Sequence, residues 1–286
     1  MDDLKLKRAF EGILQKAAAA NAPKEGDYTG DDGLLHCGTC RTPKQCVMEF
    51  YGKPLKLPCV CQCKAREAAE AAEKEAAKAA AKRAESIRQR CGISPAYTFE
   101  AAARSASLDA CKRYADRWDE MRENNVGLLL WGNIGTGKTF AAHCVCNALL
   151  QRDEPVSIFI TSLSRVLNSG WDKSETVSRV RNAPLVVFDD LGAERSSEYA
   201  LENVFMLVDE RYRARKPLIV TSNLTLNDLK NPQGMDRKRI YDRILEMCVP
   251  VYVGGASRRE ENASEKLRIM RELAVDAANE KNRPGR

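Results

Sequence analysis

Short apolar runs alternate with amphipathic stretches through the second half of the chain. Strands are predicted at residues 128–131, 156–160, 185–188, 218–221 and 249–253, and helices at 138–151, 196–214 and 237–247. Apolar strands that alternate with helices are typical of a parallel sheet with right-handed crossovers, covered by helices on both faces. The pattern therefore predicts an α/β fold.

The segment from residue 64 to 89 differs, because alanine is almost its only apolar residue. Its helix propensity is very high, but without leucine or isoleucine at a and d positions a stable coiled coil is not expected. We interpret it as a solvent-exposed, semi-rigid helical linker. A shorter amphipathic helix is predicted near the N-terminus from Leu6, Phe10, Ile13 and Leu14. The expected organisation is a small module at 1–66, a linker at 67–91 and the α/β domain at 92–286.

Composition narrows the class of protein. The 286 residues are 44% hydrophobic and 30% charged, as in soluble globular proteins, and the net charge of +6 permits a nucleic-acid surface without demanding one. No run approaches the ~18–20 apolar residues of a membrane helix. The N-terminus has no apolar signal-peptide core, so we expect a cytoplasmic protein whose eleven cysteines are reduced.

A phosphate-binding loop follows the first predicted strand of the α/β domain. The sequence GNIGTGKT matches G-x-x-x-x-G-K-[ST] and stands between a strand and a helix, as the motif requires. Its backbone N–H groups and the helix N-terminus would hold the phosphates of ATP. Lys138 would reach the β- and γ-phosphates, and Thr139 would ligate Mg²⁺. The nucleotide-binding residues are Gly132, Asn133, Ile134, Gly135, Thr136, Gly137, Lys138 and Thr139.

Acidic and amide side chains stand at the ends of two later strands. Asp189 and Asp190 end the run LVVFDD, and Asn223 follows PLIVTS. Two adjacent carboxylates raise each other's pKa unless a cation compensates, so their position indicates a metal. Asp189 is predicted to hold Mg²⁺, Asp190 to orient or deprotonate the attacking water, and Asn223 to hold that water near the γ-phosphate.

Cysteines cluster between residues 37 and 63. Cys37 and Cys40 form C-x-x-C, and three more thiols lie at Cys59, Cys61 and Cys63. Four thiolates make a closed tetrahedral Zn²⁺ site, and a segment this poor in large apolar residues normally needs a metal to fold. We choose Cys37, Cys40, Cys61 and Cys63 as ligands. Cys59 could replace either of the last two, and His36 is a less favoured alternative ligand. An iron–sulfur cluster or free thiols are the alternatives to zinc.

Taken together, GNIGTGKT, VVFDDLGAE, DERYRARKPLIVTSNL, RIYDRILEMC and a final SRR resemble the DnaC/DnaI-type replicative helicase loaders, which are AAA+ ATPases related to IstB-like transposition proteins. The resemblance covers residues 92–259. It implies that Lys138 and Thr139 are Walker A residues, Asp189 the Walker B ligand and Asn223 sensor 1. It also implies that Arg243 is an arginine finger for the adjacent subunit and that Arg259, or else Arg258, is sensor 2.

The resemblance implies an AAA+ core with a reduced lid, of which one helix at 260–278 remains. It also implies an ATPase that forms rings or spirals when ATP is bound, contacts single-stranded DNA and loads a hexameric replicative helicase, with the zinc module as its docking head. Aspartate at position 190, where many AAA+ proteins have glutamate, leaves a non-hydrolysing adaptor as a further reading.

An IstB-like transposition helper, which would bind duplex DNA and a transposase, is the alternative function. Such proteins usually lack a cysteine module, so the thiols favour the loader. DNA contact is expected mainly from the resemblance. Basic residues at Arg211, Arg213, Arg215 and Lys216 are a candidate contact, although they fit a solvated helix end equally well.

Overall fold

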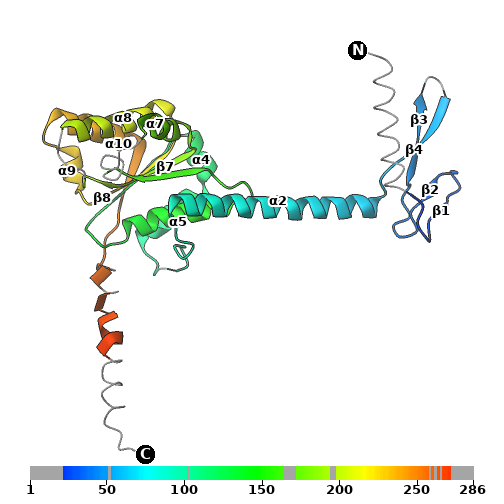
Figure 1. Ribbon diagram of the computed structural model, residues 1–286, viewed down its shortest axis with the longest axis horizontal. Coiled ribbons are helices and arrows are strands. Elements are labelled where there is room, and N and C mark those ends of the chain that lie inside the picture. Colours follow the sequence, from blue (N-terminus) through cyan, green and yellow to red (C-terminus); the bar gives the residue numbers. More distant parts are fainter. Residues whose placement is uncertain are drawn as a thin grey trace, which may run out of the picture. The chain divides into compact units, whose positions relative to one another are not determined.

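The computed structural model describes residues 22–50, 53–101, 103–163, 172–193, 198–257, 259–260, 263–264 and 266–271 (Figure 1). The predicted N-terminal helix lies outside these residues. The chain divides into two compact units, Met1–Ala79 and Ala80–Arg286.

The first unit contains the cysteine module, by which we mean residues 22–63. Its strands β1 (Tyr28–Thr29) and β2 (Leu35–His36) pair antiparallel, as do β3 (Gln45–Phe50) and β4 (Lys53–Pro58). The pattern of apolar residues in this segment does not predict these strands. A largely buried ion pair between Lys44 Nζ and Asp27 Oδ2, at 2.6 Å, fixes the chain before β1 against the start of β3.

Helix α2 (Gln62–Cys91) is the helix predicted from the alanine-rich segment. Most of it is exposed, but one side of its last turns is not: Ala84 and Ile87 are buried in the core of the second unit. Arg88 Nε also donates a hydrogen bond to Asn147 Oδ1 at 3.0 Å. The expectation of an entirely solvent-exposed linker is therefore wrong at this end, because Ile87 supplies a branched apolar side chain that the preceding turns lack.

The second unit is built on a five-stranded parallel sheet in the order β6-β7-β8-β5-β9. The strands are β5 (Gly127–Trp131), β6 (Ile158–Ser162), β7 (Leu185–Leu191), β8 (Leu218–Ser222) and β9 (Cys248–Tyr252). Strand β8 lies between β5 and β7, so the carboxyl ends of these three strands meet at one edge of the sheet. The predicted α/β fold, a parallel sheet whose strands alternate with helices along the chain, is confirmed.

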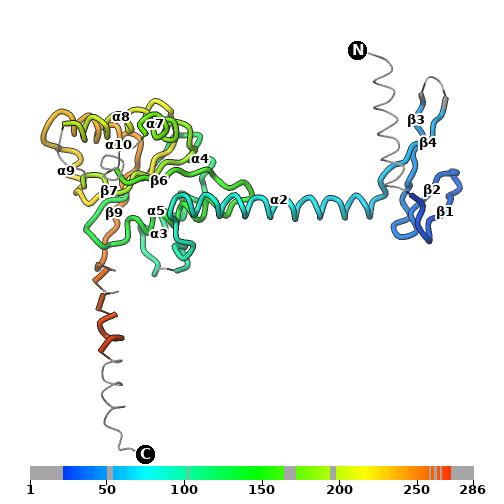
Figure 2. Tube along the Cα trace, in the orientation of Figure 1, coloured from blue at the N-terminus to red at the C-terminus, as the bar shows by residue number. Residues whose placement is uncertain are grey.

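Helices cover both faces of this sheet, as the Cα trace in Figure 2 shows, with α3 and α5 on one face and α7, α8 and α10 on the other. The helices are α3 (Ala106–Asp116), α4 (Trp118–Glu123), α5 (Lys138–Leu150), α7 (Lys173–Asn182), α8 (Glu198–Ala214), α9 (Leu226–Lys230) and α10 (Met235–Met247). Helix α7, which the sequence analysis missed, is capped by Asp172 and provides the crossover from β6 to β7. None of the helices within the described ranges has the length and apolar character needed to cross a membrane.

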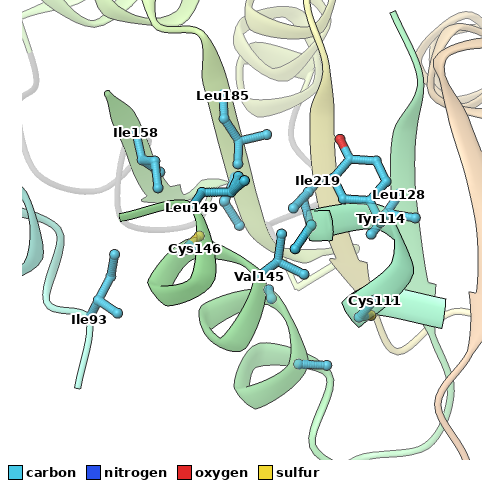
Figure 3. Close-up of a cluster of buried hydrophobic side chains, with 14 of the residues drawn as sticks. Ile93, Cys111, Tyr114, Leu128, Val145, Cys146, Leu149, Ile158, Leu185 and Ile219 are labelled. Carbon is cyan, nitrogen blue, oxygen red and sulfur yellow. The ribbon is translucent and has the colours of Figure 1, made fainter. Parts of the chain in front are cut away.

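Side chains that alternate along the strands divide the core in two. Leu128, Leu130 and Ile219 face α5, whereas Leu129 and Val220 face α8 and α10. Figure 3 shows the first cluster, where α5 inserts Val145, Cys146 and Leu149 among side chains of the sheet. Fully burying a leucine or valine contributes about 1.5–3 kcal/mol, so these clusters make the sheet edge a rigid support.

Arg211 is the largest charged side chain in this core, and it has no exposed surface. It spans the gap between α8 and the starts of β7 and β8. Its guanidinium donates hydrogen bonds to the carbonyl oxygens of Val180, Ala183, Pro184 and Pro217. Burial lowers its pKa to about 9. Arg211 is thus a brace between backbone segments, and the prediction that it contributes to a basic DNA-contact cluster is wrong.

Candidate ATP and metal sites

The phosphate loop connects β5 to α5, as the sequence predicts. Gly132, Gly135 and Gly137 all have positive φ, at 145°, 85° and 99°, which a side chain would strain. Two of them also leave no room for a Cβ: it would lie 2.4 Å from Val253 O at Gly132 and 2.3 Å from Ser257 Oγ at Gly135. The segment after β9 therefore packs directly on the loop.

Lys138, the first residue of α5, is folded onto the loop itself. Its Nζ donates to Gly132 O at 2.9 Å and to Asn133 O at 2.6 Å. Burial lowers the pKa of this amine, and the positive charge of Arg259 adds to that effect, while Asp190 and Asp189 oppose it. An incoming phosphate would replace two neutral carbonyls with a charged acceptor, which forms the stronger hydrogen bond.

Asp189 lies beside the loop helix at the end of β7. Thr139 Oγ1 donates to Asp189 Oδ1 at 2.9 Å, so the two predicted magnesium ligands are in direct contact. Thr221 Oγ1, at the end of β8, donates to the same oxygen at 2.6 Å. A carboxylate and a hydroxyl at this spacing are oxygen donors of the kind that Mg²⁺ prefers.

Asp190 adopts a strained backbone conformation next to this carboxylate. Its φ is 60°, and the register between β7 and β8 shifts between Phe188 and Leu191, as in a bulge that redirects a side chain. The Asp190 N–H donates to Thr221 Oγ1 at 2.9 Å. Burial and the Asp189 carboxylate raise the pKa of Asp190, while Lys138 and Arg259 lower it. Sequence reasoning missed Thr221, which links both aspartates to β8.

The other predicted site residues do not all lie near the phosphate loop. Asn223 directly follows β8, is exposed, and stands beside Ser222, whose Oγ donates to Leu191 O at 2.8 Å. Arg259 is exposed, yet its charge acts on Lys138 and Asp190, which puts it near the loop. Arg258 lies outside the described residues. Arg243 is on α10, where its guanidinium pairs with Asp209 of α8 rather than with the loop.

Comparison with known proteins adds to this geometry. The family model for IstB-like ATP binding protein matches residues 70–266, well over half of the chain. The chain belongs to the IstB-like ATP-binding protein family. The phosphate loop, Asp189 and Asp190 all lie within the matched segment.

Two similar relatives have curated names. The replicative helicase loader DnaC of Escherichia coli K12 is 25% identical over 165 residues, which are 54% of this chain and 65% of the relative. The replicative helicase loader DnaI of Bacillus subtilis is 26% identical over 147 residues, 46% of this chain and 47% of the relative. The chain thus covers less than two thirds of either relative.

Solved structures similar to this IstB-like chain include a crystal structure of DnaI, which is 25% identical with a TM-score of 0.48 and covers 56% of this chain and 89% of that one. A crystal structure of the DnaC helicase loader is 21% identical with a TM-score of 0.46, covering 56% and 100%.

The cysteine module brings four predicted thiols together. The Sγ atoms of Cys37, Cys40, Cys61 and Cys63 all lie within 4.8 Å of one another. Cys63 Sγ is 3.6 Å from Cys37 Sγ and 3.4 Å from Cys61 Sγ. Because tetrahedral zinc with Zn–S bonds of about 2.3 Å separates its sulfurs by about 3.8 Å, this donor set fits Zn²⁺.

Polar groups around two of the thiols favour their ionised form. The backbone N–H groups of Cys40 and Thr39 lower the pKa of Cys37, and the Thr42 hydroxyl is the main cause that lowers the pKa of Cys40 to about 5. Donors of this kind orient thiolate ligands around a metal. Cys59 is outside the cluster, with its Sγ donating to Pro43 O at 3.5 Å. His36 Nε2 instead lies 3.0 Å from Asp32.

Proposed function

We propose that this chain is a Mg²⁺-dependent ATPase that loads a replicative ring helicase onto single-stranded DNA. The observation that carries the ATPase part is the contact of Thr139 with Asp189, which joins the phosphate loop to the strand-end carboxylates. Membership of an ATP-binding family supports it. The loading part is supported by the names of the DnaC and DnaI relatives. A chain with this function would act in the cytoplasm.

Each residue of the site then has a role in hydrolysis. Lys138 leaves its two carbonyl acceptors and binds the β- and γ-phosphates. Thr139 and Asp189 would hold Mg²⁺, which would neutralise charge on the phosphates. Asp190 accepts the proton of the attacking water, and its raised pKa suits it to that role. Asn223 positions the water, and Arg259 binds phosphate in the same subunit. Arg243 is the arginine finger that binds phosphate in the adjacent subunit.

The cysteine module is proposed to bind Zn²⁺ and to dock on the hexameric helicase. Residues 1–66 form this head, 67–91 the linker and 92–286 the ATPase domain. In the ATP-bound state the chain assembles into a ring or spiral that contacts single-stranded DNA. The transposition-helper alternative is supported by the family description itself, and the four converging thiols are what favour the loader.

Phosphate release tests the ATPase proposal. We expect wild-type chain with Mg²⁺ and single-stranded DNA to release phosphate, and Lys138→Ala and Asp190→Asn to lose on the order of 10²-fold or more. Lys230→Ala, which removes an exposed lysine from α9, is the matched control and should be unchanged. Absence of phosphate release from the wild type would leave only a nucleotide-gated adaptor.

Co-purification with the full-length chain tests the partner. We expect recovery of a hexameric helicase, and loss of that recovery in Cys61→Ser, which removes one thiol of the cluster. Cys59→Ser is the control, because its sulfur lies outside the cluster. Recovery of a transposase, together with a preference for duplex DNA, would reverse the assignment.

A further inference from the structure

Arg243, the proposed arginine finger, is held by its own subunit. Its Nη2 lies 2.9 Å from Asp209 Oδ1, and its Nη1 donates to Arg239 O at 3.3 Å. Two aromatic rings of α8 complete the setting, with the guanidinium carbon 4.6 Å from the centroid of Phe205 and 5.6 Å from that of Tyr212. Both Nη groups are therefore engaged within the chain.

Comparison with Arg211, which lies on the same helix as Asp209, shows that this setting is incomplete. Arg211 is fully buried and its Nε, Nη1 and Nη2 all donate to backbone carbonyls. Arg243 has a side chain 27% exposed, and its buried Nε finds no acceptor among the described residues. Leaving a buried donor without an acceptor destabilises the fold. An arginine with a purely structural role would be stabilised by pairing its Nε and both Nη groups with acceptors, as Arg211 does. Arg243 does not have this full set of partners.

Asp209 is a carboxylate with the same recognition chemistry as a phosphate. Both anions accept from the guanidinium fork, so they compete for one arginine. Asp209 is largely buried, and its other oxygen, Oδ2, lies 2.8 Å from Arg213 Nε. Release of Arg243 would consequently leave Asp209 paired with Arg213 rather than as an isolated buried charge.

We propose that Asp209 anchors Arg243 within its own subunit and releases it when ATP bound to a second copy of this chain offers its phosphate to the guanidinium. Asp209 is thus a positioning residue that couples hydrolysis to assembly. This inference rests on the proposed function, in which Arg243 acts on the adjacent subunit. An isolated chain keeps the finger docked, and only a correctly assembled neighbour supplies the competing anion.

The test measures ATP hydrolysis and ATP-dependent sedimentation of the full chain against protein concentration. Asp209→Asn keeps the shape of the side chain but removes its charge. We expect the concentration for half-maximal activity to fall about three- to five-fold, as for the loss of a partly exposed ion pair. Self-association in ATP should shift by a similar factor. Arg213→Gln, which removes the other partner of Asp209, is the control and should not lower either midpoint.

A double variant separates the anchor from mere packing. In an Arg243→Ala background, Asp209→Asn should bring no gain, because the effect must pass through Arg243. A gain that persists in that background overturns the inference. A lower Tm with no fall in either midpoint also overturns it and makes Asp209 a structural link between α8 and α10. If Arg243→Ala alone hydrolyses ATP like the wild type, the shared-site part of the proposed function fails, and the anchor fails with it.

Discussion

Among the described residues of the cysteine module, the buried apolar side chains are Cys37 and Cys61, whereas the second unit buries two large clusters on opposite faces of its sheet. The module also buries Lys44, paired with Asp27. One region therefore places its four thiols around a shared centre, and the other places its functional groups at the ends of strands that a core already holds.

This difference separates two ways of making a site. In the second unit the sheet would exist without nucleotide, and Thr139, Asp189 and Thr221 are already in contact. In the cysteine module the predicted ligands are most of what is buried, so we expect metal binding and folding to be the same event. Metal loss should consequently abolish the module, whereas nucleotide loss should leave the second unit folded.

Removing zinc from the full chain should have the largest effect of the tests that follow. Zinc sites of this kind contribute about 10–16 kcal/mol of apparent binding free energy, which is more than a small module can replace. We expect chelation, or Cys61→Ser, to remove the hydrogen-exchange protection of β3 and β4 while β5 and β8 keep theirs.

Cys59→Ser is the control for this experiment, because its sulfur is hydrogen-bonded to Pro43 O outside the cluster. It should retain one zinc per chain. Retained protection of the hairpin after chelation would show that the module has a sufficient core of its own, and the contrast between the two regions would disappear.

Leu129→Ala tests the same contrast from the other side. Leu129 is fully buried in β5, and truncating such a leucine costs about 2–5 kcal/mol because a cavity remains. We expect the free energy of unfolding of the second unit, measured in urea, to fall by that amount, with zinc content unchanged. Val47→Ala, 53% exposed in the cysteine module, should change stability by less than about 0.5 kcal/mol. Equal effects of the two substitutions would contradict the comparison.

The residues whose positions the sequence predicts best are those set by local spacing. The spacing of its glycines predicts the phosphate loop, and the apolar strand before Asp189 predicts the position of that carboxylate. The thiols at positions 37, 40, 61 and 63 also converge as their spacing predicts. Helix α7 was missed because KSETVSRVRN offers only Val177 and Val180 as apolar positions, too few for a periodic signal.

Residues whose role depends on distant partners were harder to predict. Thr221 resembles an ordinary strand residue until β8 is known to lie next to β7, where it meets Asp189. Arg211 resembles a solvated charge, because nothing in the sequence shows that four carbonyls surround it. The partner of Arg243 lies on another helix, 34 residues earlier, so the pairing with Asp209 required the packing of α8 against α10. Parallel-sheet order and helix packing are non-local, and spacing alone does not encode them.

Asp190→Asn should give the smallest change in stability of these tests, and the direction of that change follows from the pKa of Asp190. The pKa of Asp190 is raised above its ordinary value of 3.8, chiefly by burial and then by Asp189, so the folded chain disfavours its ionised form. That cost is fully present above the raised pKa and vanishes as the pH falls towards 3.8. Without nucleotide, Asp190→Asn should therefore raise the Tm at pH 7 by on the order of one or two degrees, with the gain shrinking on acidification. Asp242→Asn, on the exposed side of α10, is the control and should show no such trend.

With Mg²⁺ and ATP bound the cation compensates both carboxylates, so the gain in Tm should disappear while hydrolysis stays lost. A gain that is independent of pH would mean that Asp190 is strained by its backbone conformation alone. The destabilisation at this position of the second unit would then come from backbone conformation and not from a buried charge.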